Sequence, residues 1–113
     1  MRAFFAGAAA LAVATLIGLG GAAAAEGDPV ATGRALVQMY CSDCHATERT
    51  DDSLLPEAPR FRDLYLLYDV EFLAEALVEG IVTAHPEMPE FEFDPDQAEA
   101  IITYLKSLEP VQP

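Results

Sequence analysis

The chain has only two cysteines, and both stand beside a histidine in the run Cys41-Ser42-Asp43-Cys44-His45. On a helix, positions i and i+3 lie about one turn apart on the same face, so both thiols can reach the two vinyl groups on one edge of a porphyrin. The imidazole that follows can then project over the ring and ligate its iron. The spacing therefore predicts one covalently attached haem c, bound by thioethers to Cys41 and Cys44 and ligated by His45.

Three other kinds of site use the same residues. A thioredoxin-like redox pair at Cys41 and Cys44 needs strands alternating with helices, and the chain shows little strand-like alternation. A zinc site of Cys41, Cys44, His45 and His85 would crowd two adjacent ligands around a tetrahedral centre. A plain disulfide would constrain the unfolded chain very little and would leave His45 unexplained. These interpretations stay open but are less favoured.

The N-terminal residues differ in composition from the rest of the chain. The stretch from Phe4 to Ala25 follows Arg2, carries no charge and ends in small residues that fit an A-x-A cleavage pattern, directly before Glu26. We therefore expect residues 1–25 to be a cleaved signal peptide and residues 26–113 to form one exported, periplasmic domain. An uncleaved membrane anchor is the alternative, because about 20 apolar residues can span a bilayer.

The expected mature domain is strongly acidic. Residues 26–113 carry nineteen acidic side chains and five basic ones, a net charge of −14. Such a surface repels phosphate and anionic lipid, which argues against nucleic-acid binding and against membrane contact by the mature form. The natural complement is a redox protein with a basic docking face. Acidity can also serve solubility alone, and charge does not separate the two interpretations.

Two helices are indicated near the ends of this domain. Asp28 and Pro29 are typical of a helix N-terminus, and an apolar stripe then runs into the cysteines. Asp94, Pro95 and Gln97 indicate a capping box at the start of the last helix. The apolar residues of the two faces are Val30, Leu36, Val37 and Tyr40 in the first helix and Ile101, Ile102, Leu105 and Leu108 in the last.

The sequence between these helices predicts a long loop and two shorter helical segments. Residues 45–59 are polar, include two prolines and read as an extended loop. A helical turn is expected within 61–68, and Asp69 caps a further segment over 70–79 that stops at Gly80. These patterns predict an all-α domain.

The segment before the last helix contains two candidates for the sixth ligand of the iron, Met88 and His85. Met88 is favoured, because a thioether suits haem iron and the neighbouring Pro86 and Pro89 stiffen the chain that presents it. His85 is the alternative, and a bis-histidine iron would have a lower potential than a His/Met one. Met39, close to the cysteines, is expected in the core.

Several features follow one another in order: a glycine and an aromatic residue before the cysteines, the attachment run, a Met-Pro pair and an apolar C-terminal helix. They are Gly33, Tyr40, Cys41–His45, Met88-Pro89 and Ala100–Leu108. In this order they resemble class I c-type cytochromes. The resemblance implies a small cytochrome c-like fold, with three to five helices packed around one covalently attached haem. It also implies that Tyr104 or Leu105 crosses the first helix near Gly33, which permits close backbone approach.

The resemblance implies further roles around the haem. The carbonyl of Pro59 would accept a hydrogen bond from the second ring nitrogen of His45 and so fix the ligating tautomer. Since the chain has no Trp, the haem propionates need other donors, and the candidates are Arg49, Arg60, Arg62 and Tyr65. Surface solvation or ion pairing with carboxylates is the alternative for these arginines.

The expected function is outer-sphere electron transfer. Iron with two protein ligands has no open position for a substrate, so we expect an electron carrier rather than an enzyme, with no catalytic residues. The acidic residues offer no convincing acid/base pair. Three alternatives remain, namely a haem-bearing subunit of a larger exported oxidoreductase, a sensor or enzyme with a displaceable Met88, and a thiol oxidoreductase.

Overall fold

The computed structural model describes residues 2–15, 27–82 and 87–112. Residues 2–15 are exposed and contain neither helix nor strand. None of the helices in the described part is long and apolar enough to cross a membrane. The predicted cleavage site at Ala25 lies outside the described residues, so the division of the chain at this point stays a prediction.

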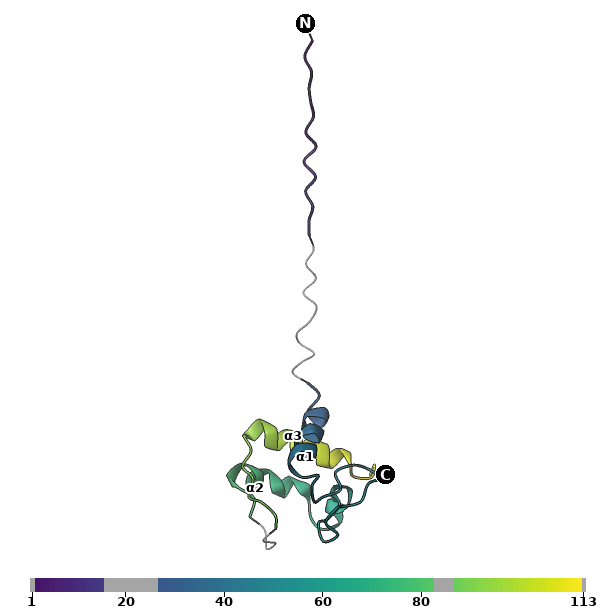
Figure 1. The fold of residues 1–113 in the computed structure, drawn as a ribbon, viewed down its shortest axis with the longest axis vertical. Coiled ribbons are helices and arrows are strands. Elements are labelled where there is room, and N and C mark those ends of the chain that lie inside the picture. Colours follow the sequence, from purple (N-terminus) through teal and green to yellow (C-terminus); the bar gives the residue numbers. More distant parts are fainter. Residues whose placement is uncertain (1, 16–26, 83–86, 113) are drawn as a thin grey trace.

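All regular secondary structure in these ranges is helical, and the prediction of an all-α domain is confirmed for them (Figure 1). The elements follow one another as α1 (Pro29–Tyr40), η2 (Phe61–Leu66), η3 (Val70–Phe72), α2 (Leu73–Glu79) and α3 (Pro95–Ser107), where η denotes a 3₁₀ helix.

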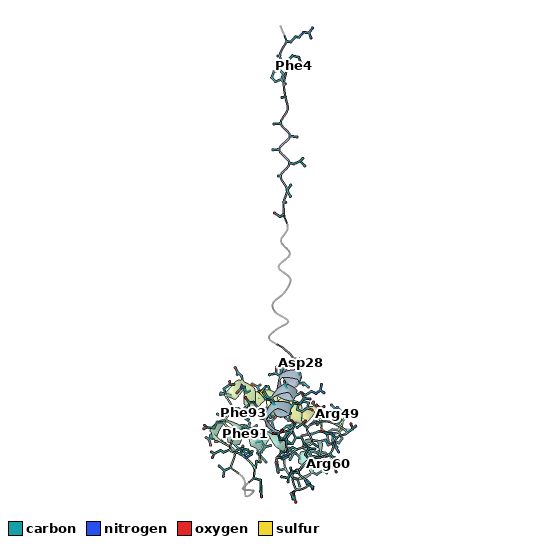
Figure 2. The ribbon with its side chains drawn as sticks, viewed as in Figure 1. Phe4, Asp28, Arg49, Arg60, Phe91 and Phe93 are labelled. Carbon is teal, nitrogen blue, oxygen red and sulfur yellow. The ribbon has the colours of Figure 1, made fainter. Side chains whose placement is uncertain are left out.

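The helix ends follow from local chemistry. The Asp28 carboxylate accepts a hydrogen bond from the Val30 amide at 3.0 Å, which caps α1 (Figure 2). At the start of α3, Asp94 accepts from the Gln97 amide at 2.8 Å, and the Gln97 side chain accepts from the Asp94 amide at 3.1 Å. The predicted capping box is therefore confirmed.

The predicted helical segment over 70–79 is confirmed, and its first turn is a 3₁₀ helix. Asp69 does cap this segment, since it accepts from the Glu71 amide at 3.0 Å. The turn that follows is the 3₁₀ helix η3, and regular α-helix begins only at Leu73. A 3₁₀ turn at the start of an α-helix is common, because its tighter winding satisfies amides that have no partner in the first α-helical turn. Gly80 ends α2 as expected, with φ of 108°.

The core lies where α1 crosses α3 (Figure 1). Gly33 is buried in the crossing, and a Cβ placed there would lie 2.0 Å from the Ala100 carbonyl oxygen and 2.7 Å from the Tyr104 Cβ. The prediction that Tyr104 meets α1 near Gly33 is confirmed. The buried apolar side chains that surround this crossing include Val37, Leu64, Val70, Leu77, Phe93, Ile101, Ile102, Leu105 and Leu108.

Two expectations about α1 need correction. Met39 was expected in the core, but its side chain is 72% exposed. The reason is helical geometry, because Met39 lies about 200° around the helix from Val37, which is fully buried against α3. Tyr40 was expected on the same buried stripe and is instead 42% exposed, at the end of the helix.

The long loop after His45 is held in place by side-chain and backbone hydrogen bonds outside regular secondary structure. The Tyr104 hydroxyl donates to the Thr47 carbonyl inside the core. Arg62 donates to the Asp51 carbonyl at 2.6 Å, and the Phe61 amide donates to the Ala46 carbonyl at 2.9 Å. These contacts fix an irregular segment beside the attachment run.

Candidate functional site

A cavity of about 690 Å³ opens beside the C-terminal end of α1. This volume lies within the range of about 300–1,000 Å³ that is usual for cofactor and ligand pockets. Three separate segments line it, namely residues 39–45, 55–59 and 87–91. The cavity brings together all five residues predicted for the site: Cys41, Cys44, His45, Pro59 and Met88.

The cysteines lie on a turn that continues α1. The Cys41 amide donates to the Val37 carbonyl at 2.8 Å, and the Cys44 and His45 amides donate to the Cys41 carbonyl at 3.2 and 2.9 Å. Both thiols are free and partly buried. Burial, and to a smaller extent Cys44, raises the pKa of the Cys41 thiol to about 11, so this thiol is neutral at neutral pH. The turn therefore presents two unbonded thiols to one cavity.

The imidazole of His45 is oriented from two sides. Its Nδ1 lies 2.7 Å from the Pro59 carbonyl oxygen, the contact that the resemblance implies. A carbonyl can only accept, so Nδ1 carries the proton and Nε2 is left with a lone pair for a metal. The ring also packs against Phe61, with ring centroids 4.8 Å apart. Sequence analysis did not identify Phe61, and its place two residues after Pro59 was the only available signal.

Met88 is partly buried and lines the cavity as part of the segment 87–91. His85, the alternative sixth ligand, lies outside the described residues. Met39 also lines the cavity, so a second thioether is close to the attachment turn. The choice of Met88 as ligand stays a prediction, and Met39 is a natural control for it.

The remaining lining is apolar inside and acidic at the rim. Tyr40, Leu55, Ala58, Pro89 and Phe91 supply apolar surface. Asp43, Glu57 and Glu87 also line the cavity and are exposed to solvent, whereas the described lining residues include no Lys or Arg. The site therefore offers an apolar interior suited to a porphyrin and a negatively charged mouth.

The arginines proposed as propionate donors are bound to protein oxygens. Arg49 donates to the Ser107 carbonyl at 2.5 Å, and Arg62 donates to the Asp51 carbonyl. In the view of Figure 2, Arg49 and Arg60 lie to the right of Phe91, which lines the cavity. Neither these arginines nor Tyr65 line the cavity. The alternative of pairing within the protein therefore describes the arginines better.

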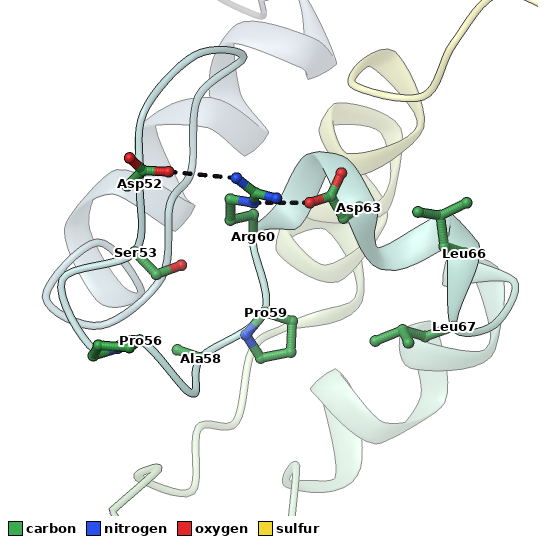
Figure 3. Close-up of a pocket in the computed structure, with 9 residues that line it drawn as sticks. All are labelled: Asp52, Ser53, Pro56, Ala58, Pro59, Arg60, Asp63, Leu66 and Leu67. Atoms are coloured by element: carbon green, nitrogen blue, oxygen red, sulfur yellow. Dashed lines mark hydrogen bonds and ion pairs between the residues drawn. The ribbon is translucent and has the colours of Figure 1, made fainter.

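Arg60 lines a second cavity, of about 600 Å³, that shares Ala58 and Pro59 with the first (Figure 3). Its guanidinium donates to Asp63 at 2.8 Å and to Asp52 at 3.4 Å. Both carboxylates are at least partly exposed, which weakens these ion pairs. Arg60 thus lies next to the attachment cavity and forms ion pairs with two acidic neighbours.

The family described as cytochrome c oxidase, cbb3-type, subunit III matches residues 28–105 of the chain. The chain belongs to this family of c-type cytochromes. The match runs from the cap of α1 into α3 and includes every residue of the predicted site, and the resemblance to c-type cytochromes is confirmed. Comparison with curated proteins and with solved structures gives no significant match.

Haem c fits the residues of this cytochrome. The cavity holds two free thiols one turn apart, an imidazole with its Nε2 available and a thioether, all on largely apolar walls. Family membership supports a haem-bearing, electron-transferring domain. Covalent attachment at Cys41 and Cys44 and ligation by His45 and Met88 stay predictions.

Proposed function

We propose that this chain is an exported monohaem c-type cytochrome that carries single electrons between redox partners by outer-sphere transfer. The observation that supports it is the single cavity lined by Cys41, Cys44, His45 and Met88, with His45 oriented by the Pro59 carbonyl. When bound there, haem c supplies an iron that cycles between the ferrous and ferric states.

The chain's own residues would anchor and tune this group. Cys41 and Cys44 would hold it from one turn, and the Pro59 carbonyl favours the proton on Nδ1 of His45, which would leave Nε2 free to bind the iron. His45 and Met88 would both ligate the iron, which would leave it no open position for a substrate. The apolar walls exclude water, and a Met ligand raises the reduction potential relative to a second His.

The first test concerns attachment and ligation. We expect the protein, expressed with haem-attachment machinery, to keep its pigment in acid acetone and to show the weak near-infrared sulfur-to-iron absorption when oxidised. Met88→Ala should abolish that absorption and lower the potential, whereas Met39→Ala should leave both unchanged. Loss of the pigment in acid acetone would refute covalent attachment. A wild type without the sulfur-to-iron absorption would transfer the ligand role to His85, and a Met88→Ala protein that keeps this absorption would transfer it to Met39, the other thioether that lines the cavity.

A second candidate function is a haem-bearing subunit of a larger exported oxidoreductase complex. The family's description, which names an oxidase subunit, favours it. Gel filtration of the protein from its native source separates the two functions. A free carrier elutes alone at the size of one small domain, whereas a subunit elutes with its partners.

For the redox partner we propose a protein with a basic docking face. Glu57 and Glu87 on the cavity rim supply the complementary charge. Electron transfer to a basic partner should therefore slow as salt rises, because ions screen charges beyond about 8 Å at physiological ionic strength. The double variant Glu57→Gln/Glu87→Gln should flatten this salt dependence more than Glu99→Gln/Glu109→Gln, which removes the same charge from the α3 region. Equal effects would assign the steering to net charge alone.

Export is proposed from the N-terminal composition. N-terminal sequencing of the protein from the periplasmic fraction should begin at Glu26. A mature protein that retains residues 1–25 in the membrane fraction would instead support an anchored form.

A further inference from the structure

Tyr40 lies between the attachment turn, Cys41 to His45, and the segment that carries Met88. It is the last residue of α1, directly before Cys41, and its side chain lines the cavity. Its ring meets the edges of two other aromatic rings, Phe91 at a centroid distance of 5.8 Å and Phe93 at 5.4 Å. Interplanar angles of 60° and 75° place both contacts in the edge-to-face class that aromatic quadrupoles favour.

The two phenylalanines belong to the segment that carries Met88. Only Pro89 and Glu90 separate Met88 from Phe91. The backbone of this segment is tied to the end of α2, because the Ile81 amide donates to the Phe91 carbonyl at 3.2 Å and the Phe93 amide donates to the Leu77 carbonyl at 2.8 Å. The Met88 segment therefore rests on α2 through its backbone.

Tyr40 adds a side-chain contact between the Met88 segment and the end of α1. The attachment turn of Cys41 to His45 continues directly from Tyr40, so the Tyr40 contacts join the turn that holds one axial ligand to the segment that holds the other. A Met side chain has three rotatable bonds and does not position itself, so its place depends on the backbone that presents it.

We propose that Tyr40 is a positioning residue for Met88. Through its ring contacts with Phe91 and Phe93, Tyr40 holds the Met88 segment over the cavity. This inference rests on the proposed axial role of Met88. This role of Tyr40 is separate from the attachment of haem to Cys41 and Cys44 and from the ligation of iron by His45. Replacing residues that orient a metal's ligands commonly changes metal affinity or activity by about 10- to 100-fold.

The test measures how readily an external ligand displaces Met88 in the oxidised holoprotein. Tyr40→Leu removes the ring, and Tyr40→Phe keeps both ring contacts. We expect Tyr40→Leu to bind imidazole about 10-fold more tightly than the wild type and to lose its sulfur-to-iron absorption at a lower temperature than its helical signal. Tyr40→Phe should match the wild type within about 2-fold, because only the hydroxyl is lost.

Three outcomes decide the matter. If Tyr40→Leu lowers the unfolding temperature but leaves imidazole affinity unchanged, the role is merely structural and the inference is wrong. If Tyr40→Phe behaves like Tyr40→Leu, the hydroxyl and not the ring is responsible, and the inference is also wrong. If Tyr40→Leu does not accumulate as holoprotein, Phe91→Leu removes one of the two ring contacts from the other side and must raise imidazole affinity.

Failure of the proposed function is distinguishable from these results. If Met88 is not the ligand, the wild type itself lacks the sulfur-to-iron absorption, or Met88→Ala retains it. The inference on Tyr40 fails separately, when the wild type shows the absorption, Met88→Ala removes it and Tyr40→Leu leaves imidazole affinity unaltered.

Discussion

Replacing Gly33 with alanine tests the close approach of α1 and α3. The new Cβ would lie 2.0 Å from the Ala100 carbonyl oxygen, 2.6 Å from its carbonyl carbon and 2.7 Å from the Tyr104 Cβ. Favourable separations of non-bonded carbon atoms are about 3.5–4.0 Å, so α1 and α3 must move apart by about 1 Å or more. The nearest atoms are backbone, and no side-chain rotation relieves the overlap.

The size of the effect follows from two opposing terms. Overpacking of a core costs about 1–3 kcal/mol, and the backbone contact places Gly33→Ala at the upper end. Alanine regains about 0.5–1 kcal/mol over glycine inside a helix. We therefore expect a net loss of about 2 kcal/mol, which corresponds to a fall in Tm of about 8–16 °C for a domain of this size.

The assay is thermal and guanidinium unfolding of the oxidised holoprotein, followed by circular dichroism. Thr32→Ala is the matched control, because Thr32 is the exposed neighbour of Gly33 on the same helix. It should change the free energy of unfolding by about 0.5 kcal/mol or less. A Gly33→Ala protein as stable as the wild type would show that α1 and α3 do not approach closely in solution.

Two further changes test the core and a helix end. Burial, with Glu48 adding to it, raises the pKa of the Tyr104 hydroxyl. The hydroxyl therefore holds its proton to higher pH in the folded state than in the unfolded state, where the tyrosine pKa is about 10. Its contribution to the free energy of unfolding is fully present below about pH 10 and is lost as the pH rises above that value. Denaturant midpoints should fall less above pH 10 in Tyr104→Phe than in the wild type, and parallel curves would contradict this. Asp94→Ala removes the cap of α3 and should cost about 1 kcal/mol in urea unfolding, while an unchanged midpoint would mean that the capping box adds nothing.

The sequence was most informative where a feature depends on neighbouring residues. Asp28 and Asp94 cap the helices that follow them, and Gly80 ends α2, because each of these interactions spans only a few residues. The attachment run is local in the same sense, since one turn of chain presents both thiols and the imidazole. The prediction of the α1–α3 crossing at Gly33 needed the family resemblance in addition, because it joins distant parts of the chain.

Errors arose where a residue's environment depends on distant elements. Met39 is apolar and lies on a helix, but the face it occupies became known only from the packing of α1 on α3. The arginines could not be assigned from the sequence either. The partner of Arg49, the Ser107 carbonyl, is far away along the chain, although Arg60 pairs with Asp63 only three residues on.

By itself, the sequence determined the helical character of the described domain, the ends of its main helices and its place among c-type cytochromes, because these depend on short patterns and on side-chain chemistry. Only the tertiary structure decided which distant residues meet. It brought Pro59 to His45, Met88 to the cavity and Phe91 to Tyr40, since contacts between separate segments are set by how the helices pack and not by the order of residues along the chain.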